Sequence, residues 1–218
     1  MNKLLRGIAE FRRTRRADYA ETFARLALTQ KPDGLLIACS DSRVAPNLFA
    51  SVEPGDLFVV RNVGNLVPPY ATAGAASGHS VPAAIEFATQ ALAVRDVIVC
   101  GHSECGAIRA IHDGRTPAGA PHLKAWLEHG QRVLKRDAGA IPDGLASHDH
   151  LSQQNVLLQL DHLRTYPAIH AAESTGRLRL HAWWFDIRHA EVLDYERASG
   201  RFVPLDETRV EKLIAERP

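Results

Sequence analysis

The feature that most constrains the fold is a set of three short, almost unbroken apolar runs. They cover residues 35–38, 57–60 and 97–100. Runs of this length without polar alternation are typical of strands that are buried on both faces. Helical patterns lie between and after them, the first behind Pro46 and another beginning near Cys105. The alternation predicts an α/β fold with a central, mostly parallel sheet that helices flank on both sides.

The remainder of the chain adds helices and a final pair of strands. Residues 121–166 have a helical pattern, which a loop around 139–144 interrupts, and residues 178–187 and 191–195 have the pattern of two terminal strands. Because no internal repeat or low-complexity linker is present, we predict one domain that spans residues 1–218.

Residues 1–30 are expected to form a helical arm. They contain two helical patterns whose apolar residues recur at spacings of three and four: Leu4, Leu5, Ile8 and Phe11, then Tyr19, Phe23 and Leu26. Neither helix is long enough to be stable alone. Their apolar faces must therefore pack on the domain body or on a partner subunit.

Composition excludes several classes of function. The 218 residues carry a formal net charge of +1, which gives no reason to expect nucleic acid or anionic lipid as a partner. No stretch approaches the ~20 apolar residues that span a bilayer, and no secretory signal is recognisable, so we predict a cytoplasmic protein without a membrane partner. Three scattered cysteines argue against a disulfide framework and favour metal binding or thiolate chemistry.

Two polar clusters follow two of the predicted strands. Residues 39–43 come directly after the first strand and residues 102–106 after the third, and ligands collect at the carboxyl ends of parallel strands. If these strands are neighbours, Cys39, His102 and Cys105 converge as two sulfurs and one nitrogen, a set that suits tetrahedral zinc. Three protein ligands leave one position open, as in catalytic rather than structural zinc sites.

Asp41 and Arg43 follow the first cysteine at intervals of two residues. Asp41 can accept a hydrogen bond from a zinc-bound hydroxide, or it can become the fourth ligand in a closed state. The Arg43 guanidinium is a planar fork that can hold the carboxylate away from the metal. The alternative is an ordinary salt bridge that pins a turn. Because two thiolates neutralise the zinc charge, we expect activity that rises toward alkaline pH.

Three segments together resemble the β-carbonic anhydrase family. They are Cys-Ser-Asp-Ser-Arg at 39–43, Glu-Pro-Gly-Asp-Leu-Phe-Val-Val-Arg-Asn at 53–62 and Cys-Gly-His-Ser-Glu-Cys-Gly-Ala at 100–107. The resemblance extends from about Gln30 to about Pro204.

The resemblance implies an activity and roles for particular residues. The enzyme would interconvert carbon dioxide and bicarbonate with one Zn²⁺ per chain, held by Cys39, His102 and Cys105, while Asp41 with Arg43 orients the attacking hydroxide. Substrate contacts would come from Gln30, Phe58, Val63, Phe87 and Gly106. The resemblance also implies a homodimer or homotetramer in which N-terminal helices embrace the neighbour and the partner supplies Phe58 and Phe87, the latter in place of a tyrosine.

A bicarbonate-inhibited subgroup of this family uses a tryptophan, an arginine and a tyrosine. The corresponding positions here are Leu36, Arg61 and Phe185, so only the arginine is kept. We therefore expect the plant-like subgroup and no bicarbonate allostery of this type.

Two other functions compete with this interpretation. A carbonyl sulfide or carbon disulfide hydrolase would use the same type of zinc site with a different pocket. A non-catalytic zinc protein, or a thiol redox protein that uses Cys39 and Cys105 as a dithiol, would need neither Asp41 nor Arg43.

Several other polar residues and one cysteine have simpler interpretations. Cys100 ends a buried strand and is expected to be a core residue. His148 and His150 are interpreted as a solvated helix start, and His79 as a loop histidine. Glu104 can be a general base or can stabilise a helix N-terminus, and the sequence does not decide between them.

Overall fold

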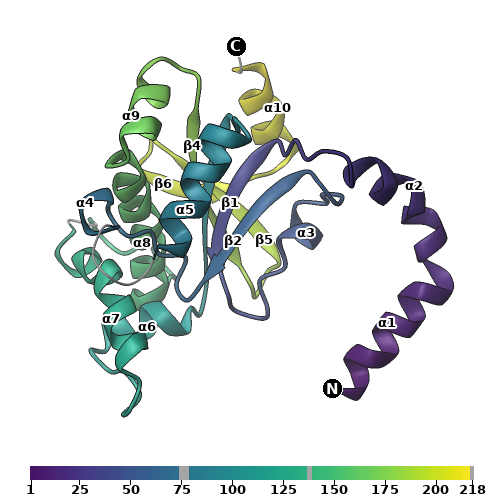
Figure 1. Ribbon diagram of the computed structural model, residues 1–218. Coiled ribbons are helices and arrows are strands. Elements are labelled where there is room, and N and C mark those ends of the chain that lie inside the picture. Colours follow the sequence, from purple (N-terminus) through teal and green to yellow (C-terminus); the bar gives the residue numbers. More distant parts are fainter. Residues whose placement is uncertain (74–78, 137–138, 217–218) are drawn as a thin grey trace.

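A computed structural model describes residues 1–73, 79–136 and 139–216 (Figure 1). Its six strands form one sheet in the order β2-β1-β3-β4-β5-β6. The bounds are β1 Gly34–Cys39, β2 Leu57–Asn62, β3 Asp96–His102, β4 Arg179–Asp186, β5 Glu191–Glu196 and β6 Arg201–Pro204. The strands β1 to β4 pair in parallel, whereas β5 pairs antiparallel with β4 on one side and with β6 on the other. The predicted α/β class and the mostly parallel sheet are confirmed.

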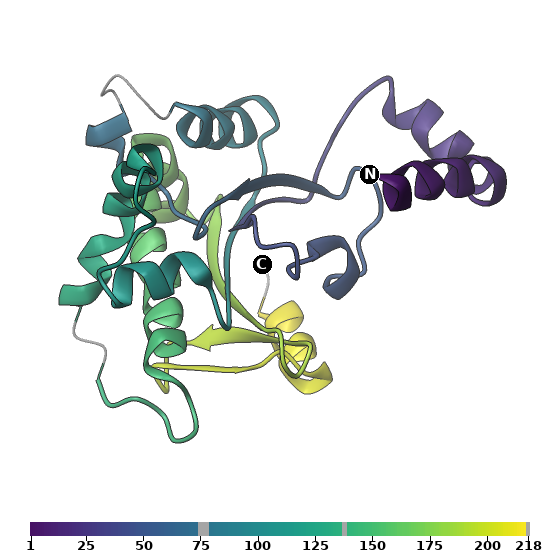
Figure 2. The same ribbon diagram turned by 90° about the horizontal axis from the view of Figure 1, so that it is seen from below.

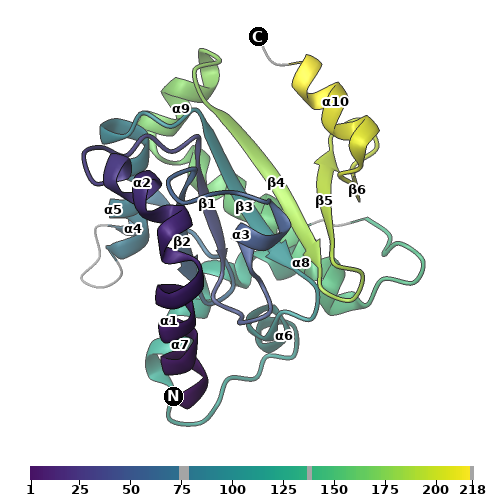
Figure 3. The same cartoon turned by 90° about the vertical axis from the view of Figure 1, so that its right-hand side faces the viewer.

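Helices lie before, between and after the strands. They are α1 Asn2–Thr14, α2 Arg16–Leu26, α3 Pro46–Phe49, α4 Tyr70–Ala73, α5 Ser80–Glu86, α6 Gly106–His112, α7 Pro121–Leu127, α8 Ser147–Arg164, α9 Pro167–Ser174 and α10 Glu207–Ala215. A π-helical segment, Phe87–Ala91, extends α5, and a 3₁₀ segment, Glu128–Lys135, extends α7. Seen from the side in Figure 3, the long helix α8 lies beside the strands β3 and β4, which it contacts.

The central strand β1 is buried on both faces, as its unbroken apolar run predicts. Leu35 and Ile37 belong to a core cluster that includes side chains of α5, α8 and α9. Leu36 and Ala38 point the other way, into a second cluster that packs against Phe49 of α3. Alternate residues of one strand thus hold two layers of the fold together.

Helix α8 approaches β3 unusually closely. A Cβ atom on Gly101 would lie 2.6 Å from Val156 Cγ2 and 3.1 Å from Trp184 Cδ1, so only glycine fits at this position. The close approach places one side of α8 against the carboxyl end of β3, where the predicted ligands lie.

The N-terminal arm forms the two predicted helices and touches the body of its own chain at its end, where Leu26 of α2 lies against Gly55. Helices α1 and α2 extend away from the sheet (Figures 1 and 2), and neither has a buried residue. Exposed apolar side chains line α1, including Ile8 at 67% exposure and Phe11 at 42%. Across the described residues, no helix has the length and hydropathy that crossing a membrane requires.

Candidate metal centre

The parallel pairing of β1 with β3 brings the two polar clusters together. Cys39 is the last residue of β1 and His102 the last of β3, and Cys105 caps the start of α6 three residues later. All three residues are buried, and their ligating atoms lie within 4.8 Å of one another. The structure therefore assembles the three ligands that the sequence predicts.

The imidazole of His102 is oriented as a metal ligand requires. Its Nδ1 lies 2.8 Å from the Ser103 carbonyl oxygen and donates to it, which leaves the lone pair on Nε2. Nε2 is buried and has no hydrogen-bond partner among the described residues. A buried polar atom without a partner is costly, and a metal ion would satisfy it. The donor set of two sulfurs and one imidazole nitrogen fits zinc.

A hydrogen bond joins the sulfurs of Cys39 and Cys105. The hydrogen bond from the Cys105 thiol lowers the pKa of Cys39 far below its usual value, and the same contact together with burial raises the pKa of Cys105. One proton is thus shared between two sulfurs, and a divalent cation can replace it. Cys100 differs, because burial raises its pKa to about 12, which is consistent with the core role that we predict for it.

Asp41 is held by Arg43 through both carboxylate oxygens. Arg43 Nε donates to Oδ1 at 2.9 Å and a terminal nitrogen donates to Oδ2 at 2.7 Å, while the Arg43 backbone N–H also reaches Oδ1. These hydrogen bonds lower the pKa of Asp41 well below its usual range. Arg43 additionally donates to the carbonyl of Glu104 at 3.0 Å, so it connects the two loops that carry the ligands.

Arg61 of β2 stabilises the backbone of the first ligand loop. Its guanidinium donates to three carbonyl oxygens, those of Cys39, Asp41 and Val44, at 2.7–3.0 Å. Loop carbonyls next to a buried site need such partners, because water does not reach all of them. The resemblance assigns Arg61 only to the bicarbonate-inhibited subgroup, so this role was not predicted.

A stripe of polar side chains on α8 was also missed by the sequence analysis. Asp149 accepts from the Glu104 N–H at 2.6 Å, Ser152 donates to the His102 carbonyl at 2.8 Å, and Asn155 donates to the Gly64 carbonyl at 3.1 Å. Further along the stripe, Gln159 accepts from the Val67 N–H and His162 contacts the Val67 carbonyl. Their spacing of three and four residues within 147–164 indicates one shared helix face, but it does not show that this face is buried against the ligand loops.

The structure corrects two minor expectations. His150 is 5% exposed and His148 is half-buried, so this histidine pair is not a solvated helix start. Glu104 precedes α6 instead of lying in its first turn, and its φ of 55° is in the left-handed region. Its carboxylate pairs with Arg109 and lies 3.5 Å from His148 Nε2. These contacts tie the ligand loop to α8.

The predicted substrate residues fall into two groups. Val63 and Gly106 adjoin the ligand loops, next to Gly64 and Cys105 respectively. Phe58 and Phe87 contact each other at a ring distance of 5.7 Å, but Phe58 pairs with Leu35, four residues before Cys39 in β1. That separation is roughly 13 Å along a strand. Gln30 lies exposed between α2 and β1.

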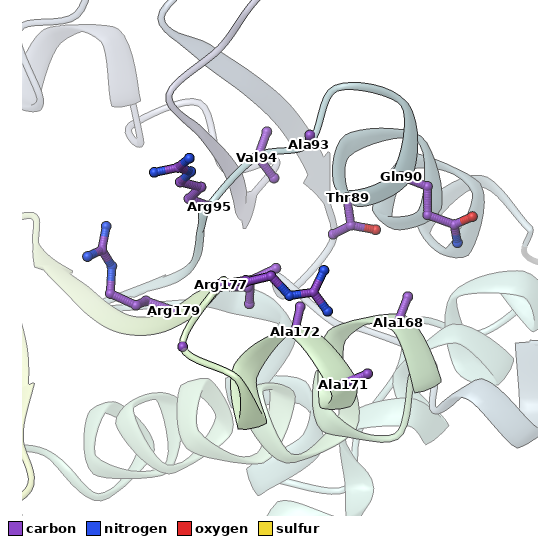
Figure 4. A pocket seen from close by; sticks show the side chains of 12 residues that line it. Thr89, Gln90, Ala93, Val94, Arg95, Ala168, Ala171, Ala172, Arg177 and Arg179 are labelled. Atoms are coloured by element: carbon purple, nitrogen blue, oxygen red, sulfur yellow. The ribbon is translucent and has the colours of Figure 1, made fainter. Parts of the chain in front are cut away.

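A cavity lies at the other end of the sheet from the candidate centre. It has a volume of about 720 Å³, and Arg95, Arg177 and Arg179 lie around it with small side chains of α9 (Figure 4). Arg179 is committed to a bidentate ion pair with Asp96. Although burial opposes it, hydrogen bonds from His181 and Arg179 lower the pKa of Asp96. The cavity therefore adjoins a structural ion pair and not the predicted ligands.

Comparison with known proteins identifies the class of this enzyme. Residues 34–192 match the carbonic anhydrase family. The chain is 40% identical over 208 residues to a carbonic anhydrase of Pseudomonas aeruginosa, which covers 95% of this chain and 93% of the relative. It also resembles the structure of the β-carbonic anhydrase CcaA, with 39% identity, a TM-score of 0.84 and coverage of 95% and 92%.

A further structural relative comes from a fungus. The tetrameric β-carbonic anhydrases of Sordaria macrospora include a structure with 28% identity, a TM-score of 0.73 and coverage of 94% of this chain and 95% of that one. The chain belongs to the β-class carbonic anhydrase family, and it is an enzyme of that family.

The Arg61 contacts generate a prediction about metal affinity. Arg61→Gln removes the donors that hold three loop carbonyls, and loss of such outer contacts weakens metal binding by about 10- to 100-fold. Chelator competition with zinc will measure the change. The control is Arg95→Gln, which removes an exposed arginine at the opposite end of the sheet and should leave zinc affinity unaltered. Equal affinities in both variants would contradict the role assigned to Arg61.

Proposed function

We propose that this enzyme catalyses the zinc-dependent, reversible hydration of carbon dioxide to bicarbonate and a proton. The observation that carries the proposal is a buried Cys39, His102 and Cys105 set with an unpartnered Nε2, beside an Asp41 carboxylate that Arg43 holds. Zinc, when bound, supplies the Lewis acid that lowers the pKa of water enough for it to attack carbon dioxide near neutral pH. Membership of the carbonic anhydrase family supports this reaction.

Asp41 would orient the nucleophile by accepting its hydrogen. Both carboxylate oxygens are engaged by Arg43, an arrangement that favours the open state over the closed state in which Asp41 becomes the fourth ligand. Because the pKa of Asp41 is lowered, the carboxylate and its ion pair persist at neutral and alkaline pH and are lost only in strong acid. A rise of activity between pH 6.5 and 9 would therefore reflect the loss of a proton from a group other than Asp41.

The substrate pocket requires a second chain. Phe58 pairs with Leu35, four residues before Cys39, and Phe87 contacts Phe58, so neither ring would line the site of its own subunit. Phe87 is 46% exposed, and Val63 near the candidate ligands is 41% exposed. Two copies would bring the aromatic pair of one chain to the open side of the other. Gly106, whose position has open space around it, would then offer its backbone N–H to the substrate.

The arm would contribute to the same assembly. The apolar side chains of α1 are unburied in a single chain, so a partner subunit is the surface that we propose for them, in a homodimer or homotetramer. The tetrameric relatives from Sordaria macrospora support the higher assembly. The predicted cytoplasmic location stays a prediction.

The interior of the fold supports the plant-like subgroup. Phe185 stacks on Phe49 at 4.7 Å, Leu36 is fully buried, and Arg61 is committed to backbone carbonyls. A tryptophan and a tyrosine that would help to bind bicarbonate are thus replaced by packed apolar side chains. Within the described residues, no feature of the site favours the sulfur-substrate or dithiol alternatives over carbon dioxide hydration.

The first test is stopped-flow carbon dioxide hydration by the zinc-loaded protein from pH 6.5 to 9. We expect fast turnover that rises with pH and that Cys39→Ala abolishes, because a ligand is lost. Cys100→Ala is the matched control, since it removes a buried cysteine that is not among the ligands, and it should retain activity. Zinc binding without hydration, together with release of sulfide from carbonyl sulfide, would overturn the proposal.

Bicarbonate inhibition is expected to be absent. Added bicarbonate at pH 7.5 should slow hydration only as a product does, without a sigmoidal dependence on its concentration. The physical reason is that Leu36 and Phe185 offer bicarbonate no polar group. The measurement is the initial rate across a bicarbonate series at constant ionic strength. A Hill coefficient well above one would place the protein in the other subgroup.

The arm generates a prediction about assembly. Ile8→Glu puts a charge in the exposed apolar stripe of α1 and should shift the oligomer toward smaller species, with loss of hydration activity if the pocket is shared. Arg6→Glu, on the opposite side of the same helix, is the control and should leave the mass unaltered. Light scattering after size exclusion, across a dilution series, measures both. An unaltered mass for Ile8→Glu would remove the arm from the interface.

A further inference from the structure

A chain of two hydrogen bonds runs from the indole of Trp126 to the sulfur of Cys39. Trp126 Nε1 donates to the carbonyl oxygen of Val63 at 2.7 Å. The next residue along, Gly64, donates its backbone N–H to Cys39 Sγ at 3.4 Å. The Val63 carbonyl and the Gly64 N–H belong to the same peptide group, so one amide accepts from the indole and donates to the sulfur.

Such an arrangement couples the two bonds electronically. A donor at the carbonyl oxygen polarises the amide and makes its N–H a stronger donor, by about 10–30% per bond in a chain of hydrogen bonds. A stronger N–H draws electron density from the sulfur that accepts it. A thiolate with less electron density is a weaker donor to a metal, which leaves the metal a stronger Lewis acid.

Several contacts other than that of Trp126 hold the Val63–Gly64 peptide in position. Gly64 has a φ of 84°, and a Cβ there would lie 3.0 Å from Ala107 Cβ, so the loop passes tightly over α6. Asn62 bonds the backbone of Leu66 through both side-chain atoms, and the buried Asn155 donates to the Gly64 carbonyl. The amide is therefore held toward Cys39 by contacts that do not involve Trp126.

Trp126 itself is positioned by packing. It lies on α7, contacts two of the apolar core clusters and meets His129 edge to face at 5.3 Å. The ring is held by packing against these apolar clusters and His129, while its one polar atom is directed at the Val63 carbonyl. A phenylalanine would preserve most of the packing and remove only the N–H.

We propose that Trp126 is a positioning residue whose indole N–H, acting through the Val63–Gly64 peptide, reduces the electron donation of the Cys39 sulfur to the bound metal. This inference rests on the proposed function, because it assumes a metal at Cys39. It adds to that function an interaction that tunes the metal from outside its ligands.

The test is the absorption spectrum of the cobalt-substituted enzyme, which contains charge-transfer bands from thiolate to metal. Trp126→Phe leaves the Cys39 sulfur richer in electrons, so its band should move to longer wavelength. A ring-fluorinated tryptophan incorporated at position 126 keeps the shape, strengthens the N–H donor and should move the band the opposite way. The control is Trp183→Phe, since the Trp183 indole makes no hydrogen bond within the described part of the chain and packs on the far face of the sheet.

The outcomes separate this inference from the proposed function. Opposite shifts for the two changes at position 126, with none for Trp183→Phe, support the relay, because general loosening of the site would not reverse sign. Identical bands in wild type and both position-126 proteins would overturn it, as would shifts in the same direction. The cobalt spectra can be measured whether or not the protein hydrates carbon dioxide. The stopped-flow assay tests the reaction independently, so a failure of the proposed function is distinguished from a failure of this inference.

Discussion

Two thiol sulfurs and one imidazole nitrogen lie within 4.8 Å of one another in a buried part of this chain. The surrounding structure is arranged to hold these three atoms close together. Two thiolates repel each other unless a proton or a cation lies between them, and a buried Nε2 without a partner is itself unfavourable. A metal ion would satisfy both groups. The hydrogen bonds around the site hold the three side chains in this arrangement.

Those hydrogen bonds are distributed over most of the fold. Arg61 supports the loop after β1, Arg43 joins that loop to the loop after β3, and α8 holds the second loop through Asp149 and Ser152. The close approach of α8 at Gly101 makes the last of these contacts possible. A substitution at any of these positions would shift the backbone that carries the sulfurs, although none of these side chains is itself a candidate ligand.

The sheet and the candidate ligands were predictable for simple reasons. Unbroken apolar runs indicate strands buried on both faces, and parallel strands end at one edge, so Cys39 and His102 had to meet if β1 and β3 were neighbours. The outer contacts were not predictable in the same way. Asn155, Ser152 and Trp126 are ordinary residues in helical patterns, and their partners are backbone groups that carry no signature in the sequence.

The sequence by itself therefore determined the α/β class, the two polar clusters and the Asp41–Arg43 spacing, because all of these follow from local patterns within a few residues. Only the tertiary structure decided the strand order, the orientation of His102 and the direction of the Gly64 N–H toward Cys39. It also decided that Phe58 and Phe87 lie far from Cys39 in their own chain. Each of these depends on which distant segments pack together, and a pattern along the chain does not contain that information.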